Sequence, residues 1–193
     1  MNRRTYWLLS VLVIVSVGSV FVSGAMGHGD EREDQARWKR EWKDMPRAVA
    51  AVTNDHYANE CGACHIAYPP GLLPSRSWNR VMAGLEDHFG DDASLPPETA
   101  EIIAAYLDDN ASDRAGSRIG AKIGRSIGLS EAPLRISETA YFQRKHDEVP
   151  QRMVRDNPKV KSFANCAACH RQAESGVFDE HDVQVAGFEQ ARF

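Results

Sequence analysis

The chain has 193 residues, of which 42% are hydrophobic and 26% charged, and its formal net charge is −4 at pH 7. This acidic balance argues against nucleic acid as a partner, because contact with phosphates needs an excess of basic side chains. A chain of this length is sufficient for one compact domain with a core of its own.

Residues 1–27 have the pattern of an export signal: Arg3 and Arg4 provide a basic start, an apolar run covers residues 6–22, and small residues follow at 23–27. The apolar run approaches the roughly 20 residues that span a bilayer, so an uncleaved N-terminal anchor is the alternative to cleavage. In both cases the basic start stays on the cytoplasmic side. We therefore expect the rest of the chain to be periplasmic, either soluble after cleavage or anchored to the cytoplasmic membrane.

Residues 28–193 are expected to form one small domain of short helices and loops. A charged N-terminal helix covers residues 30–46, and a second helix ends before Pro69 and Pro70, which cannot continue a helical ladder. No segment has a convincing strand pattern. Residues 179–193 are expected to be a C-terminal tail.

A third helix is predicted from Ser75, because apolar residues recur at three- and four-residue steps as far as Phe89. This stripe consists of Trp78, Val81, Met82, Leu85, His88 and Phe89. Ser94 and Glu98 resemble the capping pair of a fourth helix. The Gly-rich segment 110–133 is interpreted as a loop or a weak helix.

A short helix is predicted from Ser137, and Pro150 stops it. This helix places His146 on an apolar face. Ser162 is predicted to cap the last helix, which carries the second of the two cysteine motifs described next.

Two pentapeptides with the pattern C-x-x-C-H occur at residues 61–65 and 166–170, and they use all four cysteines of the chain. The pattern is the attachment motif for c-type haem: both thiols add to vinyl groups of one porphyrin, and the following imidazole binds the iron. The motifs supply Cys61, Cys64, Cys166 and Cys169 for attachment, and His65 and His170 as proximal ligands. A redox cysteine pair, a zinc site or two disulfides would leave both histidines unexplained. We therefore predict a mainly α-helical domain wrapped around two covalent haem c groups.

The sixth ligand of each iron decides whether that iron can bind oxygen or peroxide. Among the seven histidines, His88 and His146 share helical faces with apolar residues, which favours them as distal ligands. The weaker candidates are His56 in its polar context, the terminal His28 and His181, and the methionines Met82 and Met153.

The pairing of distal ligands with haems stays open. No methionine follows His170, so the second haem takes its distal ligand from upstream, where His146 is the nearest candidate on a helix. His88 follows His65 after a proline-rich turn that can fold the third helix back over the first porphyrin. A crossed arrangement, in which His88 serves the second haem, is the alternative.

The sequence resembles the bacterial dihaem cytochrome c family, often called DHC, over about residues 56–178. The resemblance is carried by residues 60–74, 75–90, 133–136, 145–146 and 165–170. It implies a periplasmic electron carrier with two bis-histidine haems, in which His88 and His146 are the distal ligands. It also implies redox partners of two kinds, a small oxygen-binding monohaem cytochrome c and a membrane-bound b-type cytochrome.

Three functional classes follow from two covalent haems. An electron carrier needs two six-coordinate irons and no substrate pocket, and it is the class we predict; such a protein is not an enzyme. A dihaem peroxidase needs one open or displaceable iron position, and usually a much longer chain. A gas-binding or sensor cytochrome needs one five-coordinate iron.

Overall fold

The computed structural model describes residues 28–189. The predicted export signal at residues 1–27 therefore lies outside the described residues, as do the last four residues of the predicted tail. The chain divides into two compact units, Met1–Trp38 and Lys39–Phe193, and the second unit contains both cysteine motifs.

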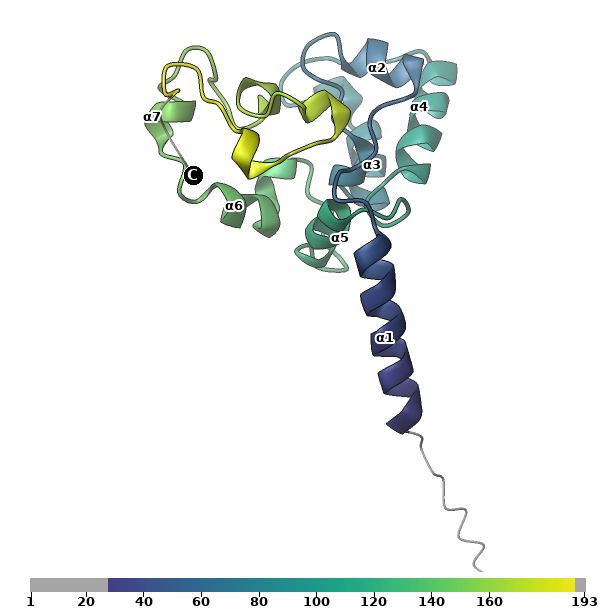
Figure 1. Cartoon of the computed structure of the whole chain (residues 1–193). Helices are drawn as coiled ribbons and strands as arrows, with labels where there is room; N and C mark the ends of the chain where they lie inside the picture. The colour runs from purple at the N-terminus through teal and green to yellow at the C-terminus, as the bar shows by residue number, and fades with distance from the viewer. Residues whose placement is uncertain (1–27, 190–193) are drawn as a thin grey trace, which may run out of the picture. The chain divides into compact units, whose positions relative to one another are not determined.

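The described part of the chain is helical, with short helices joined by turns (Figure 1). Its α-helices are α1 His28–Asp44, α2 Asp55–Cys61, α3 Ser75–Met82, α4 Pro97–Asp109, α5 Arg118–Arg125, α6 Ala140–His146 and α7 Gln151–Val154. Single 3-10 turns are η1 Pro70–Leu72, η2 Leu85–Asp87, η3 Ile136–Glu138, η4 Cys166–Ala168, η5 Ala173–Ser175 and η6 Glu180–Asp182. Residues 28–189 contain no β-strand and only two isolated β-bridges, so the prediction of a mainly α-helical fold is confirmed.

The helix α1 begins and ends within two residues of its predicted bounds. Its last carbonyl groups are satisfied from α5: Arg118 donates to the main-chain oxygens of Trp42, at 3.1 Å, and Lys43, at 2.5 Å. The Arg125 guanidinium also lies 5.2 Å from the ring centroid of Trp42. No helix in the described residues is long and apolar enough to cross a membrane.

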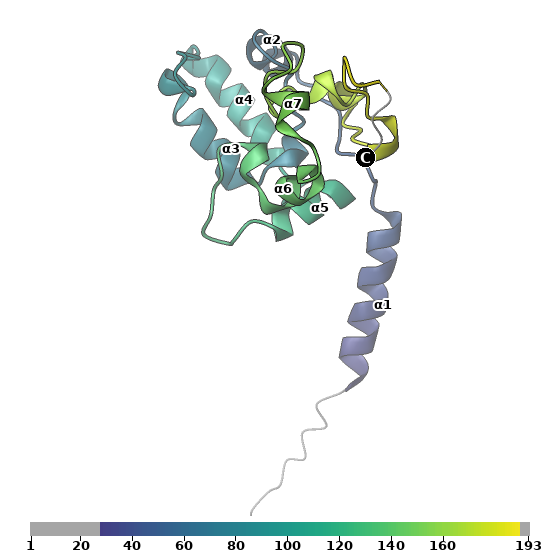
Figure 2. The ribbon, with the colours of Figure 1, turned by 90° about the vertical axis from the view of Figure 1, so that its left-hand side faces the viewer.

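The largest buried cluster lies where α4 packs against α2 and α3 (Figures 1 and 2). Its buried members are Tyr57, Leu73, Trp78, Ile103, Leu107 and Ala111. The indole nitrogen of Trp78 donates to the Pro70 oxygen at 2.7 Å, which fixes α3 against the turn after the first motif. This cluster supports one side of the first cysteine motif, since Cys61 packs against it.

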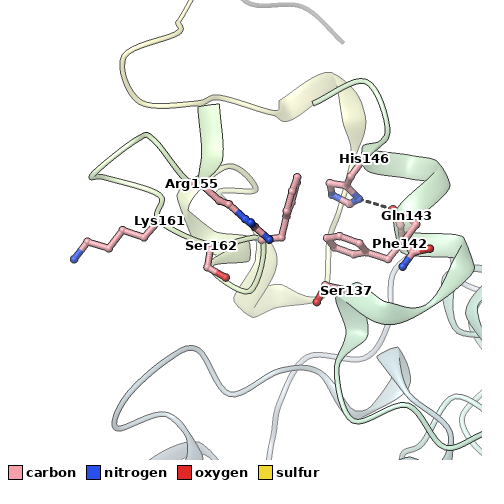
Figure 3. A pocket seen from close by; sticks show the side chains of 8 residues that line it. Ser137, Phe142, Gln143, His146, Arg155, Lys161 and Ser162 are labelled. Carbon is pink, nitrogen blue, oxygen red and sulfur yellow. Dashed lines mark hydrogen bonds between the residues drawn. The ribbon is translucent and has the colours of Figure 1, made fainter. Parts of the chain in front are cut away.

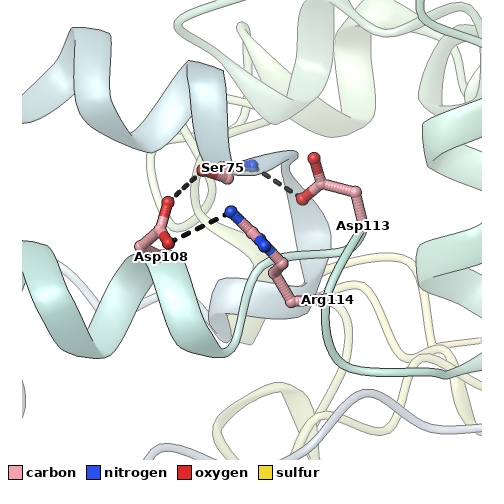
Figure 4. Close-up of polar contacts among 4 residues, drawn as sticks. All are labelled: Ser75, Asp108, Asp113 and Arg114. Carbon is pink, nitrogen blue, oxygen red and sulfur yellow. Dashed lines mark hydrogen bonds and ion pairs between the residues drawn. The ribbon is translucent and has the colours of Figure 1, made fainter.

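The start of α3 is held by two carboxylates rather than by a serine cap (Figure 4). Ser75 is the first residue of the helix; its main-chain nitrogen donates to Asp113 at 2.9 Å and its hydroxyl donates to Asp108. Arg114 lies 3.5 Å from Asp108 and offsets part of the negative charge. The predicted cap at Ser75 is therefore wrong, because Pro74 occupies the cap position.

Two further predictions about helix ends differ from the structure. The third helix ends at Met82 instead of continuing to Phe89, whose φ of 62° is left-handed. The capping pair predicted for α4 is absent, because Pro96 is the cap residue and Pro97 the first helical residue, a position that proline favours.

The glycine-rich segment 110–133 contains a capped helix, α5, where Ser117 accepts a hydrogen bond from the main-chain nitrogen of Gly120. A Cβ at Gly120 would lie 2.9 Å from the main-chain oxygen of Gly71, so glycine permits α5 to approach η1 closely. Residues 118–125 of the segment are thus helical, in line with the weak-helix alternative, and they pack against η1.

The second motif lies in a 3-10 turn, η4, and not in the α-helix predicted from Ser162. The chain reverses just before it, where Lys161 has a left-handed φ of 68°. In the first motif only Cys61 is helical, and Gly62 ends α2. A C-x-x-C-H motif does not require a long helix, because its two cysteines and its histidine all lie within five consecutive residues.

Candidate functional site

The first motif opens onto a cavity of about 460 Å³. Cys61, Cys64 and His65 line one side, and His88 lies across from them. All six residues of the predicted apolar stripe also line this cavity, although the helix ends halfway along the stripe. The stripe therefore predicted residues that line the cavity, although only its first half is helical.

His65 and His88 face one another with ring centroids 6.3 Å apart and ring planes at 28°. Two imidazoles that bind one metal from opposite sides have centroids about 6.3 Å apart, since each metal–nitrogen bond is about 2.0–2.1 Å and each nitrogen lies about 1.1 Å from its centroid. The pair has this spacing. Nδ1 of His65 lies 2.6 Å from the Ile66 oxygen, which leaves Nε2 available to a metal.

His88 is positioned by a tight loop between η2 and Asp91. Its main-chain nitrogen donates to the Asp91 oxygen at 2.7 Å, and the neighbouring Phe89 ring lies 4.8 Å from the imidazole. The guanidinium of Arg135 covers Phe89 at 3.6 Å from the ring centroid. Burial, with a smaller contribution from His65, lowers the pKa of His88 and favours the neutral imidazole that binds metals.

His146 and His170 form a second facing pair, with ring centroids 6.2 Å apart and ring planes at 79°. In α6, the ring of Phe142 stacks on His146 at 3.8 Å, and Nδ1 of His146 lies 2.8 Å from the Phe142 oxygen (Figure 3). Phe163 meets the same imidazole edge-on at 5.8 Å. Two aromatic rings and one carbonyl thus fix the orientation of His146, and a cavity of about 370 Å³ lies beside it.

His170 is placed by the turn that contains the second motif. Its main-chain nitrogen donates to the Cys166 oxygen at 2.8 Å, and the Phe178 ring lies edge-on at 5.5 Å. Its Nδ1 is buried and has no hydrogen-bond partner within residues 28–189. Burial lowers the pKa of both His146 and His170, which favours the neutral form of both rings.

The four cysteines are free thiols in the described structure. Burial raises the pKa of Cys61 and of Cys166 to about 11, so both side chains are neutral at physiological pH. No three His, Cys, Asp or Glu side chains of residues 28–189 converge in a group suited to a metal ion. Each motif instead provides two thiols and one imidazole with a second imidazole at 6.3 or 6.2 Å, a set that suits a porphyrin with four nitrogen ligands of its own.

The weaker distal candidates do not form pairs with a motif histidine of the kind that His88 and His146 form. His56 is exposed on α2, His181 is exposed in η6, and the side chain of His28 lies outside the described residues. Met82 lines the first cavity, but it is His88 that faces His65.

Met153 is buried in a separate cluster around Val154, Val160 and Val185. Its thioether therefore serves packing in that cluster.

Sequence reasoning assigned no function to three residues at these sites. Tyr68 stacks on His65 at 4.7 Å, Arg135 covers the His88 loop, and Phe163 contacts His146. Burial and the Cys166 thiol raise the pKa of Tyr68 to about 12. The signal available in the sequence was the aromatic residue three positions after the first motif and another three positions before the second.

Two motifs, each with a second imidazole at metal-ligand spacing, define a protein with two covalent haem sites. The dihaem cytochrome c family model matches residues 57–178. No curated protein matches the chain.

Solved structures that are similar to the chain include the following two. A diheme cytochrome type c from Shewanella baltica is 46% identical, covering 70% of this chain and 95% of that chain with a TM-score of 0.59. A diheme cytochrome c from Rhodobacter sphaeroides is 47% identical, covering 67% and 100% with a TM-score of 0.60.

The chain belongs to the dihaem cytochrome c family. Membership confirms the resemblance seen in the sequence and the prediction of two haem c groups with iron.

Proposed function

We propose that this protein is a periplasmic electron carrier in which both irons are ligated by two histidines. The first haem is attached to Cys61 and Cys64, with His65 as proximal and His88 as distal ligand. The second is attached to Cys166 and Cys169, with His170 as proximal and His146 as distal ligand. Each haem, when bound, supplies the exchange of one electron at its iron.

The observation that carries the proposal is the pair of facing imidazoles at each motif, at 6.3 Å and 6.2 Å. The same distances support the direct pairing of His88 with the first motif over the crossed arrangement. If His65 and His88 hold one iron and His170 and His146 the other, neither iron would offer a site to peroxide or a gas. This favours a carrier over a peroxidase or a sensor, and we propose no small-molecule substrate.

The surrounding residues keep the imidazoles fixed during electron exchange. Carbonyl oxygens at Nδ1 hold the rings of His65 and His146 with Nε2 turned away, and Phe142 prevents rotation of His146. Apolar side chains, among them Trp78 and Leu85, line the first site together with His88. Rigid ligands reduce the rearrangement that accompanies a change of iron charge.

The proposed partners are redox proteins of the periplasm and its membrane. Family resemblance supports two of them, a small oxygen-binding monohaem cytochrome c and a membrane-bound b-type cytochrome. The basic start and apolar run within residues 1–27 support export, with either cleavage or anchoring.

Mass spectrometry and absorption spectra test the proposal together. Denatured protein should carry the mass of two haems, and the variant Cys61→Ala/Cys64→Ala should carry one. The oxidised protein should be wholly low-spin, and the reduced protein should not react with carbon monoxide. A high-spin fraction that binds carbon monoxide would instead support the peroxidase or sensor class.

A further inference from the structure

Tyr68 contacts both haem sites. Its ring stacks on the imidazole of His65 with centroids 4.7 Å apart and planes at 26°. Its hydroxyl donates to the main-chain oxygen of Ala164 at 2.7 Å, across 96 residues of sequence. Ala164 lies two residues before Cys166, the first cysteine of the second motif.

The Ala164 carbonyl is shared between Tyr68 and the second motif. The main-chain nitrogen of Cys166 donates to the same oxygen at 3.0 Å, and the Cys166 sulfur lies 3.7 Å from it. Cys166 also lines the first cavity, together with His65. One side chain therefore connects the proximal imidazole of the first site with the attachment segment of the second.

Tyr68 is itself fixed in the fold. Its main-chain oxygen accepts a hydrogen bond at 2.7 Å from the hydroxyl of Tyr57, which is buried in the cluster between α2 and α4. The next two residues, Pro69 and Pro70, are fully buried and restrict the backbone that follows. Because Tyr68 is held in this way, it fixes the position of Ala164 relative to His65.

We infer that Tyr68 is a positioning residue that sets the separation of the two haems and thereby the rate of electron exchange between them. The inference rests on the proposed function, because it needs both haems bound at the two motifs. Electron tunnelling slows exponentially with distance, so a small relaxation of the second attachment segment away from His65 lowers the exchange rate. The hydroxyl holds this spacing, and the stacked ring holds the plane of His65.

Two substitutions separate these contributions. Tyr68→Phe keeps the ring on His65 and removes only the bond to Ala164, whereas Tyr68→Leu removes both contacts. The matched control is Tyr106→Phe, which removes a hydroxyl that accepts from the main-chain nitrogen of Thr53 at 3.1 Å and does not join the two motifs. Each phenylalanine variant loses one hydrogen bond between a tyrosine hydroxyl and the main chain.

The measurement is exchange NMR of the haem methyl groups in half-reduced holoprotein, together with electron paramagnetic resonance (EPR) of the oxidised protein. We expect Tyr68→Phe to slow exchange between the haems several-fold with an unchanged first-haem EPR signal, and Tyr106→Phe to change neither. Tyr68→Leu should slow exchange and also alter the first-haem signal.

Equal exchange rates in Tyr68→Phe, Tyr106→Phe and the unmodified protein would overturn the inference, and an unaltered first-haem signal in Tyr68→Leu would overturn the part that concerns His65. If Tyr68→Phe does not fold, the exchange rate of Tyr68→Leu decides. Unmodified protein without two low-spin haems would contradict the proposed function instead.

Discussion

The imidazole planes of His146 and His170 cross at 79°, whereas the equivalent planes of His65 and His88 lie within 28° of parallel. Mutual orientation of axial imidazoles controls the anisotropy of a low-spin ferric haem. Near-perpendicular rings give a signal with a very large principal g value, and near-parallel rings give a rhombic signal. We therefore expect two distinct low-spin species of equal intensity in the EPR spectrum. Two superimposed rhombic signals would show that the ring angles differ from those described here.

The pairing of distal ligands can be tested in variants that retain one haem. Cys166→Ala/Cys169→Ala leaves only the first haem, so adding His88→Ala should make the remaining iron high-spin and reactive to carbon monoxide. Adding His146→Ala to the same background should leave it low-spin, because His146 faces His170.

The exposed His56 provides the control, and His56→Ala should also leave the remaining iron low-spin. The reverse result for His88 and His146 would establish the crossed arrangement.

The two neighbouring isoleucines of α4 provide a matched pair for stability. Ile103 is fully buried in the cluster with Trp78, and Ile102 is 38% exposed. Ile103→Ala should lower the free energy of unfolding by about 2–5 kcal/mol through lost burial and the cavity that remains. Ile102→Ala should change it by no more than about 0.5 kcal/mol. Denaturant titration of both holoproteins measures the difference, and similar losses would mean that α4 presents another face.

Two glycines with left-handed backbone allow the conformational cost of an added side chain to be measured apart from its steric cost. Gly176 has φ of 75°, and a Cβ there would lie 2.1 Å from the Val49 oxygen; Gly187 has φ of 87° and open space around it. Gly187→Ala should destabilise by about 1–2 kcal/mol, the cost of a left-handed alanine. Gly176→Ala should cost more, about 3 kcal/mol or above, because backbone must move as well. Thermal unfolding of the two variants measures this, and equal shifts would argue against the close contact at Val49.

Chemistry that lies within a few residues could be predicted from the sequence. Each C-x-x-C-H motif contains its attachment residues and one imidazole, so the two haems followed directly from spacing. His88 and His146 were identified because apolar neighbours marked the faces they share. The stripe predicted the lining of the first cavity although the helix ends at Met82, and the role of His88 as a ligand stays a prediction.

Features that depend on tertiary contacts could not be predicted. The bond from Tyr68 to Ala164 spans 96 residues, and no local pattern indicates it. The close packing of α5 against η1, which requires glycine at position 120, likewise has no local signal in the sequence. The second motif was assigned to a helix because Ser162 resembles a cap, but the reversal at Lys161 leaves only a single turn.

The left-handed backbone of Phe89 has a consequence for the order in which the protein unfolds. A left-handed backbone costs a residue such as Phe89 about 1–2 kcal/mol of stability. The loop that carries His88 is held against this cost by the contact of Phe89 with Arg135 and by the hydrogen bond of His88 to Asp91. Such loops open before the elements around them. His146 lies in the helix α6 and is stacked on Phe142. On gradual denaturation, the first haem should lose its distal imidazole, and become high-spin, while the second is still intact.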